Sequence, residues 1–203
     1  MNTIKLDNRK ISPSKIVCVG RNYVEHIEEL NNDIPSEPVI FIKPNSSISD
    51  NLCFNKNDAI HYEGEISFLI QSGDLYGIGF GLDLTKRDVQ SKLKAKGLPW
   101  ERAKSFDKSA VFSSFVPFNG NIQALRMELY INGNLSQQAG YELMLNKPAE
   151  ILDEVKKNFS FEDGDLMMTG TPSGVGAIQI GDQFLGKIFE GNKLLVEGAW
   201  TVQ

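Results

Sequence analysis

The stretch AIHYEGEISFLI, residues 59–70, alternates between two kinds of side chain. A period of two is typical of a β-strand, in which successive side chains point to opposite faces of the sheet. On one face, Ile66 and Phe68 can enter a hydrophobic core. On the other face, Glu63 and Glu65 lie side by side. The sequence therefore predicts a strand with two neighbouring carboxylates on its second face.

Three further elements precede this strand. The run KIVCVG at residues 15–20 is β-branched, ends in glycine and predicts a strand. The segment NYVEHIEEL at residues 22–30 has apolar residues at helical spacing and predicts a short helix. The run PVIFIKP at residues 38–44 is bracketed by prolines and predicts another strand.

Downstream of residues 59–70 the pattern changes to that of a helix. Thr85 and Asp88 have the spacing of a capping box, and apolar residues four apart follow them. Gly97 is placed to end this helix. The next segment, LPWERAKSFDKS at residues 98–109, is polar and predicts irregular structure.

Most of the remaining chain is predicted to be β-structure. Asn132 and Gly133 are a hairpin signal, and residues 148–158 predict one more helix. Beyond that helix, glycine and aspartate separate apolar runs, which is typical of short strands joined by tight turns. We therefore expect a β-dominated α+β fold with two or three helices. No linker, charge block or repeat divides the chain, so we expect a single domain over residues 1–203.

The composition argues against several classes of protein. The 203 residues include 21 basic and 26 acidic ones, and the net charge of −5 has the wrong sign for coating nucleic-acid phosphates. No apolar stretch approaches the roughly 18 residues of a membrane span, and the charged start MNTIKLDNRK lacks the apolar segment of a signal peptide. We therefore expect a cytoplasmic protein whose partners include neither nucleic acid nor a membrane.

Cysteine and histidine are too scarce for most metal sites. Cys18 and Cys53 lie far apart, which supports neither a disulfide framework nor a thiolate zinc site. His26 and His61 are the only histidines, so a site built on three imidazoles is excluded. A metal ion in this chain would have to be held mainly by oxygen.

Three carboxylates could form such an oxygen site. Glu63 and Glu65 share a strand face, although a bare pair of this kind can also belong to a solvated face. Asp83 ends the glycine-rich run GIGFGLD, just before the predicted helix, and by itself could be an ordinary loop aspartate. Together the three suit a hard divalent cation, Mg²⁺ or Mn²⁺ in its place.

Six motifs in a fixed order carry a family resemblance. They are VGRNYVEHIEEL, PVIFIKP, HYEGE, GLDLTKRDVQ, GLPWERAKSFD and MTGTPSGVG, and the match around them runs from about Lys15 to beyond Ile188. In this order the sequence resembles the fumarylacetoacetate hydrolase superfamily, and within it the single-domain branch of acylpyruvate hydrolases and oxaloacetate decarboxylases. The resemblance implies a mixed β-roll with a few short helices, similar to the C-terminal domain of fumarylacetoacetate hydrolase. It also implies a homodimer, and Mg²⁺ held by Glu63, Glu65 and Asp83.

The resemblance assigns further roles residue by residue. Lys104, in AKSFD, matches a lysine that faces the substrate oxygen, while His26 and Glu29 match a catalytic dyad on a lid helix that orders over the site. Three other positions match residues that contact substrate: Arg87, Gln90 and Thr171, and the Thr171 hydroxyl matches one that binds the substrate carboxylate. Lys43 matches a lysine that stabilises the closed lid.

These roles imply an enzyme that cleaves a C–C bond in small 2-oxo mono- or dicarboxylic acids. With acylpyruvates, His26 oriented by Glu29 would activate water, and cleavage would release a carboxylic acid and the enolate of pyruvate. With oxaloacetate, loss of CO₂ would leave the same enolate, which the metal would stabilise. Two alternatives stay open: an isomerase or hydratase of 2-hydroxy-dienoic dioates, and a catalytically idle member that only binds a dicarboxylate.

Overall fold

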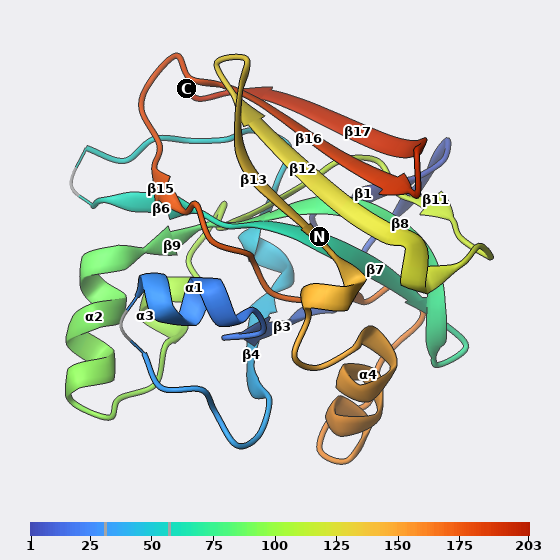
Figure 1. Ribbon diagram of the computed structural model, residues 1–203, viewed down its shortest axis with the longest axis horizontal. Helices are drawn as coiled ribbons and strands as arrows, with labels where there is room; N and C mark the ends of the chain where they lie inside the picture. Colours follow the sequence, from blue (N-terminus) through green and yellow to red (C-terminus); the bar gives the residue numbers. More distant parts are fainter. Residues whose placement is uncertain (31, 57) are drawn as a thin grey trace.

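The computed structural model describes residues 1–30, 32–56 and 58–203. Its largest sheet has the strand order β4-β3-β14-β7-β8-β10-β5, with β11 beside β8 (Figure 1). Its strands are β3 (Lys15–Gly20), β4 (Val39–Pro44), β5 (Ile48–Ser49), β7 (Gly64–Gln71), β8 (Asp74–Asp83), β10 (Ala110–Phe112), β11 (Val116–Pro117) and β14 (Leu166–Met168). The pairs β3–β14 and β5–β10 are parallel and the other pairs are antiparallel, so the sheet is mixed.

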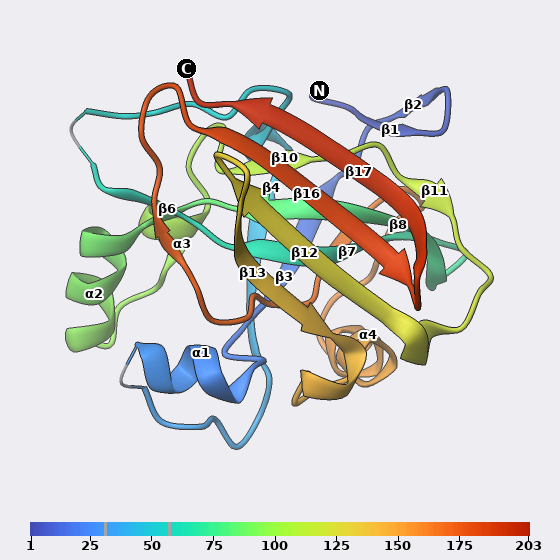
Figure 2. The same ribbon diagram turned by 45° about the horizontal axis from the view of Figure 1, so that its top comes forward.

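A second sheet lies over the first. It is antiparallel, in the order β13-β12-β16-β17, and Figure 2 shows it as a layer across β7 and β8. Its strands are β12 (Leu125–Ile131), β13 (Asn134–Gly140), β16 (Gln183–Glu190) and β17 (Lys193–Thr201). Phe80 of β8, Met127 of β12 and Ile188 of β16 are buried in one hydrophobic cluster between the layers. Burial of such side chains contributes most of the folding free energy.

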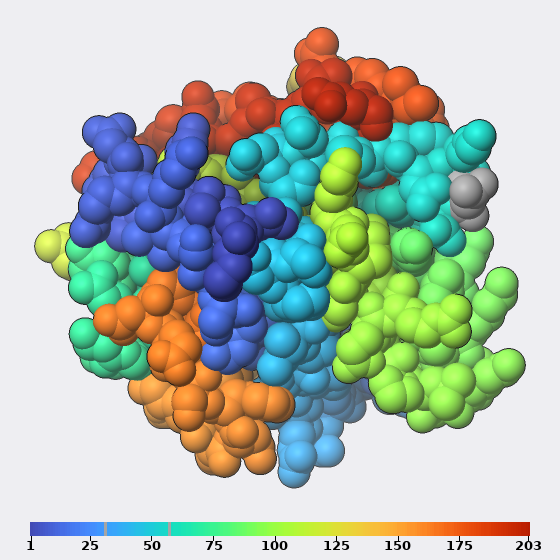
Figure 3. All heavy atoms as spheres, turned by 180° about the vertical axis from the view of Figure 1, so that it is seen from behind, coloured from blue at the N-terminus to red at the C-terminus, as the bar shows by residue number. Residues whose placement is uncertain are grey.

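Short elements complete the fold. They are the hairpin strands β1 (Ile4–Leu6) and β2 (Arg9–Ile11), and the small sheet β15-β6-β9, made of β15 (Gly176–Ala177), β6 (Ile60–Tyr62) and β9 (Thr85–Lys86). The helices are α1 (Val24–Glu29), α2 (Arg87–Ala95), α3 (Glu101–Lys104) and α4 (Pro148–Lys156), with 3₁₀ turns at η1 (Asn45–Ser47), η2 (Ile122–Ala124) and η3 (Tyr141–Leu143). Seen from behind, the segment containing β4 lies between α4, in orange, and α2 and α3, in green (Figure 3). Strands thus dominate and helices are few, which confirms the predicted fold class.

None of the described helices is long and apolar enough to cross a membrane.

The strand predicted over residues 59–70 is divided in two. β6 ends at Tyr62 and β7 begins at Gly64, and the two strands belong to different sheets. Gly64 is buried so tightly that a Cβ atom there would lie 2.9 Å from the ring of Phe80. All residues from Gly64 to Ile70 are buried. Ile66, Phe68 and Ile70 belong to the cluster shared with the second sheet, and Leu69 belongs to another cluster with Ile4 and Leu6 of β1. The solvated second face considered for this strand is therefore wrong.

The helix predicted from Thr85 begins later. Thr85 lies in β9, opposite His61, and α2 starts at Arg87 without a side-chain cap. The Thr85 hydroxyl accepts a hydrogen bond from Lys104 instead, at 2.6 Å, so the predicted capping box is wrong. The irregular structure predicted for residues 98–109 is also partly wrong because α3 lies there. A helix of four residues is too short to produce a periodic pattern.

Two other sequence signals are confirmed. Asn132 and Gly133 form the turn between β12 and β13, with φ angles of 51° and 81°. Positive φ at both central residues is the conformation that makes Asn-Gly a hairpin turn. The predicted helix over residues 148–158 is α4, which has proline in its first turn.

Asp165 joins β14 to the start of β3. Its buried carboxylate accepts hydrogen bonds from the backbone N–H groups of Ser14, Lys15 and Glu162 and pairs with the Lys15 ammonium. Burial alone would raise the pKa of Asp165, but hydrogen bonds from Lys15, Glu162 and Ser14 outweigh it and lower that pKa. The charged form is thus preferred in the folded state.

Replacing Asp165 by asparagine is expected to lower the free energy of unfolding at neutral pH by about 2 kcal/mol, the scale of hydrogen bonds to a charged group. Because the folded pKa is depressed, this stabilisation is present above the ordinary aspartate pKa of about 3.9 and is lost as pH falls through the lower folded value. Urea unfolding of Asp165→Asn should therefore differ from wild type at pH 7 and converge with it in acid. Asp153→Asn, at an exposed position of α4, is the control; an equal effect of both substitutions would contradict the prediction.

Candidate active site

Three carboxylates meet where β6, β7 and β8 come together. Glu63 lies in the break between β6 and β7, Glu65 is the second residue of β7, and Asp83 ends β8. The Asp83 N–H group donates to the Glu63 carbonyl at 2.9 Å, which brings the end of β8 level with the break. One carboxylate oxygen from each residue lies within 4.8 Å of the others, and each residue is at most 5% exposed. The fold thus gathers the three carboxylates that the sequence singled out into one buried cluster.

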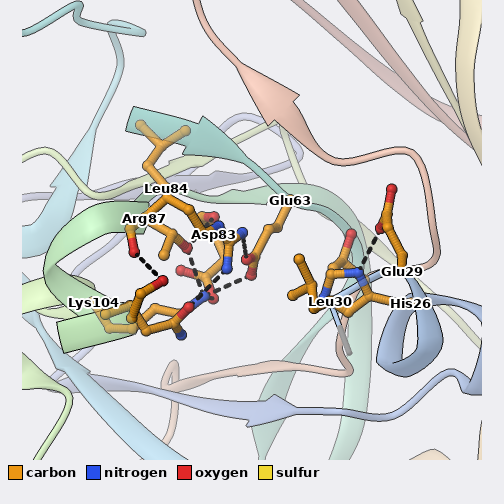
Figure 4. Close-up of polar contacts among 12 residues, drawn as sticks. His26, Glu29, Leu30, Glu63, Asp83, Leu84, Arg87 and Lys104 are labelled. Carbon is orange, nitrogen blue, oxygen red and sulfur yellow. Dashed lines mark hydrogen bonds and ion pairs between the residues drawn. The ribbon is translucent and has the colours of Figure 1, made fainter. Parts of the chain in front are cut away.

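Two cations contact Glu63 in this cluster. Lys104 Nζ lies 2.6 Å from Glu63 Oε2 and 2.7 Å from Asp83 Oδ2, and an Arg87 Nη lies 2.5 Å from Glu63 Oε1 (Figure 4). Burial alone would raise the pKa of Glu63, but the charges of Lys104 and Arg87 outweigh it and hold that pKa well below its usual range. Burial alone would lower the pKa of Lys104, and the charges of Asp83 and Glu63 raise it instead. Glu63 and Lys104 are both charged at neutral pH.

Lys43 lies on the buried side of Asp83. Its ammonium group lies 2.8 Å from Asp83 Oδ1, donates to the hydroxyl of Ser109 at 3.0 Å and also bonds to the backbone carbonyl of Lys104. The Lys43 side chain is fully buried. These contacts fix the position of Asp83, whereas the predicted action of Lys43 on a lid stays a prediction.

Glu65 differs from its two neighbours because no cation contacts it directly. Its carboxylate accepts a hydrogen bond from the Gly170 N–H group at 2.6 Å, and among the described residues no ion pair reaches it. Burial, followed by the charges of Asp83 and Glu63, raises the pKa of Glu65 well above its ordinary value. The cluster therefore favours binding of an additional positive charge.

A hard divalent cation fits this donor set. Mg²⁺ and Mn²⁺ prefer carboxylate oxygens, and three such ligands leave coordination positions for water or substrate. Glu63, Glu65 and Asp83 are the residues that would hold the ion. Lys104, which bridges Glu63 and Asp83, would then be available to a bound anion beside them.

The predicted catalytic dyad lies on α1. His26 Nδ1 is 3.0 Å from Glu29 Oε2, and because an ionised carboxylate can only accept, this contact requires a proton on Nδ1. In a neutral imidazole with that tautomer, Nε2 holds the lone pair. The other Glu29 oxygen accepts from the Gly174 N–H group at 3.0 Å, and Ser173 donates to Glu25 at 3.1 Å. α1 is thus docked on the loop that contains the TGTPSGVG motif.

Helices α1 and α2 close a small cavity above the carboxylates. His26 of α1, Arg87 and Gln90 of α2, and Glu63 and Lys104 all line it, and its volume is about 20 Å³. An Arg87 Nη donates to Gln90 Oε1 at 2.7 Å, so these two predicted substrate contacts are linked to each other. The structure therefore brings two of the predicted catalytic residues, His26 and Lys104, to one small cavity together with the predicted metal ligand Glu63.

Thr171 has its hydroxyl engaged within the fold. That hydroxyl donates to the Gly64 carbonyl at 2.9 Å and accepts from the side-chain amide of Gln137 at 2.9 Å. Gln137 also accepts from the Gly64 N–H group and donates to the Pro172 carbonyl, so it ties the start of β7 to the TGTP loop. The predicted contact of the Thr171 hydroxyl with a substrate carboxylate stays a prediction. Gln137 has no signal in the sequence, because a lone glutamine on a hairpin strand has no distinctive spacing.

The family relationship follows from comparison with known proteins. Residues 15–198 match the family model for the fumarylacetoacetate (FAA) hydrolase C-terminal domain. The chain belongs to the fumarylacetoacetate hydrolase family. The resemblance expected from six collinear motifs is confirmed, and the mixed, curled sheet is the fold of this family's known structures.

Individual relatives of this fumarylacetoacetate hydrolase family member cover nearly all of the chain. The oxaloacetate tautomerase YcgM of Escherichia coli (strain K12) is 40% identical over 199 residues, which is 89% of this chain and 90% of that protein. The solved structure of a protein from Oleispira antarctica, assigned as a fumarylacetoacetate isomerase/hydrolase, has a TM-score of 0.94 and 39% identity, with both chains fully covered. Fumarylpyruvate hydrolase from Pseudomonas aeruginosa, solved with Mn²⁺ and pyruvate, has a TM-score of 0.89 and 28% identity, covering 99% of this chain and 95% of that one.

Proposed function

We propose that this protein is a metal-dependent enzyme that acts next to the keto group of small 2-oxo acids, with oxaloacetate as its first candidate substrate. The observation that carries the proposal is that His26, Glu63 and Lys104 line one small cavity, and that Glu63 also belongs to the buried cluster of three carboxylates. This arrangement unites a general base, a fixed cation and a site for a hard metal. The names of the Escherichia coli and Pseudomonas aeruginosa relatives support the substrate class.

Each residue has a part that follows from its position. Bound at Glu63, Glu65 and Asp83, Mg²⁺ or Mn²⁺ would act as a Lewis acid toward the 2-oxo acid. Lys104 supplies a positive charge beside the oxygen on which negative charge develops as an enolate forms. Arg87 and Gln90 orient the acid from the α2 side. His26 Nε2 takes or returns a proton at the substrate carbon next to the keto group, while Glu29 holds the imidazole tautomer.

One set of residues can serve three reactions of this class. Tautomerisation of oxaloacetate needs proton transfer at that carbon, and decarboxylation of oxaloacetate loses CO₂ to give the enolate of pyruvate. Hydrolysis of an acylpyruvate requires, in addition, that His26 activates water at the distal carbonyl. The His26–Glu29 pair favours hydrolysis as the second candidate function, since it has the geometry of an oriented base. Isomerisation of 2-hydroxy-dienoic dioates uses the same proton transfer and is the remaining alternative.

The other predictions from the sequence are carried forward as proposals. We infer Mg²⁺ as the metal, with Mn²⁺ as a substitute, and a homodimer as the assembly. The cytoplasmic location, and the lack of nucleic-acid or membrane partners, stay predictions.

An assay panel tests the proposed function. The protein, first freed of metal with a chelator, is given Mg²⁺ or Mn²⁺ and then oxaloacetate, acetylpyruvate or a 2-hydroxy-dienoic dioate, with products followed by NMR and enol decay by ultraviolet absorbance. We expect turnover of oxaloacetate that requires added metal. Metal-independent rates, or no turnover of any of the three acids with either metal, would overturn the proposal.

A further inference from the structure

Two cations of the active-site cavity are left without a carboxylate partner. Arg21 and Lys94 line the same cavity as Glu63 and Lys104. One Arg21 Nη donates to Asn32 Oδ1 at 3.1 Å, and Lys94 Nζ lies 3.5 Å from the same neutral oxygen. In residues 1–30, 32–56 and 58–203, no acidic group forms an ion pair with either cation. Arg21 Nε is buried without a hydrogen-bond partner.

The other two cations of the cavity differ in this respect. Arg87 and Lys104 are neutralised by Glu63 and Asp83, at distances of 2.5 to 2.7 Å. The cavity therefore has a neutralised end at the carboxylate cluster and an excess of positive charge at the Arg21 and Lys94 end. Arg21 and Lys94 are only partly buried, and an anionic group bound between them would balance the excess positive charge at this end.

The backbone holds Arg21 in a costly conformation. Its φ angle is 57°, in the left-handed region that arginine rarely adopts. The next residue, Asn22, is buried and fixes the turn, because its amide donates to the Thr169 carbonyl at 2.8 Å and to the Asn146 carbonyl at 2.9 Å. Backbone strain that surrounding contacts enforce is typical of functional positions. The strained turn directs Arg21 to the cavity.

Lys94 reaches the cavity from α2 and not from the turn that contains Arg21. It lies one turn after Gln90 and two turns after Arg87, so all three residues share one face of α2. Its ammonium group lies 5.0 Å from the centre of the Trp100 ring. Burial first, and then the charges of Arg21 and Arg87, lower the pKa of Lys94 to about 8, while Glu63 raises it and Lys104 lowers it. An ammonium group that has lost much of its water binds an anion more strongly than an exposed one.

We propose that Arg21 and Lys94 form a subsite for the second carboxylate of a 2-oxo diacid, and so select diacids over 2-oxo acids with a neutral tail. The inference rests on the proposed function, which places the keto-acid end of the substrate at Glu63, Glu65 and Asp83. A bound diacid would place its keto-acid end beside Lys104 and its second carboxylate between Arg21 and Lys94. Because the cavity of about 20 Å³ holds little more than one water molecule, α1 must move outward to admit the diacid. Asn32 orients both cations in the absence of ligand.

Binding calorimetry in the presence of Mg²⁺ tests the subsite without depending on turnover. The ligands are N-oxalylglycine, a 2-oxo diacid analogue with an unreactive amide, and its glycine-end methyl ester, which keeps the length and loses the distal charge. Oxalate serves as a ligand for the keto-acid end alone. We expect wild type to bind the diacid about 10- to 100-fold more tightly than the ester, the range given by hydrogen bonds between charged groups.

Two variants remove one cation each. Lys94→Gln removes the ammonium group, and Arg21→Asn removes the guanidinium group while placing at this φ angle a residue that tolerates it. Each should reduce the preference for the diacid about tenfold and change the affinity for oxalate less than about threefold. Lys94→Arg should retain the preference. Lys92→Gln, an exposed lysine on the same helix, is the matched control and should leave all three affinities unchanged.

The outcomes separate the two proposals. If wild type binds oxalate but does not prefer the diacid, or if both variants keep the preference, the subsite is refuted and the proposed function stands. If oxalate does not bind wild type with either Mg²⁺ or Mn²⁺, the proposed function fails, and the subsite fails with it. Circular dichroism of each variant establishes that a lost preference comes from a folded protein.

Discussion

Replacing Glu65 by glutamine is expected to abolish binding of Mg²⁺ and Mn²⁺, with a loss of affinity of at least about 100-fold. Outer residues that only support a metal ligand already change affinity by about 10- to 100-fold, and Glu65 would be a ligand itself. Among the described residues, no cation contacts Glu65, whereas cations contact the other two carboxylates of the cluster. A bound metal ion would therefore supply the positive charge that Glu65 lacks. Glutamine keeps the shape and can still accept the Gly170 hydrogen bond.

Calorimetric titration of the chelator-treated protein with each metal measures this loss. The control is Glu101→Gln, an exposed carboxylate on α3, which should bind both metals like wild type. Because Glu65→Gln relieves the repulsion among three buried carboxylates, its metal-free form should unfold at no lower urea concentration than wild type. Unchanged Mg²⁺ affinity in a folded Glu65→Gln protein would show that the ion does not bind at this cluster.

Replacing His26 by alanine is expected to separate the candidate reactions. Hydrolysis of an acylpyruvate requires a base that activates water, and a positioned general base contributes about 10²–10⁴-fold to a rate. Decarboxylation of oxaloacetate needs no such base, so His26→Ala should spare it. Tautomerisation of oxaloacetate requires proton transfer at carbon and should fall together with hydrolysis.

The measurement compares kcat/KM for the three reactions on the same preparation. Lys104→Ala is the companion variant, because it removes the cation beside the developing enolate and should slow all three reactions. Glu28→Gln, an exposed carboxylate on α1, is the control for an effect of altering the helix itself. Equal losses in hydrolysis and decarboxylation for His26→Ala would mean that the imidazole closes the site and does not transfer a proton.

The cluster of three carboxylates could be anticipated from the sequence because its geometry is local. Glu63 and Glu65 are two residues apart, and Asp83 ends the neighbouring strand, so strand pairing alone brings them together. The dyad of His26 and Glu29 is likewise one helical turn. Arg87 and Gln90 are spaced in the same way, although the residues that they face come from other elements.

Features that depend on three-dimensional contacts could not be read from the sequence. The break at Glu63 arises because β6 and β7 join different sheets, which no period of two reveals. Gln137, on a hairpin strand, donates a hydrogen bond to the Thr171 hydroxyl. The Thr85 hydroxyl accepts a hydrogen bond from Lys104 and does not cap α2. The subsite of Arg21 and Lys94 joins a strained turn to a helix face 73 positions later along the chain, which only the folded backbone places at one cavity.

The hydrogen bond from the Gly174 amide to Glu29 gives this protein an internal reporter. That amide belongs to the loop that receives α1, and its partner is the residue that orients His26. Its chemical shift and its rate of exchange with solvent therefore depend on whether α1 is docked. In an isotope-labelled sample, one backbone resonance would record opening and closing of the helix during turnover, with no probe attached near the reacting groups.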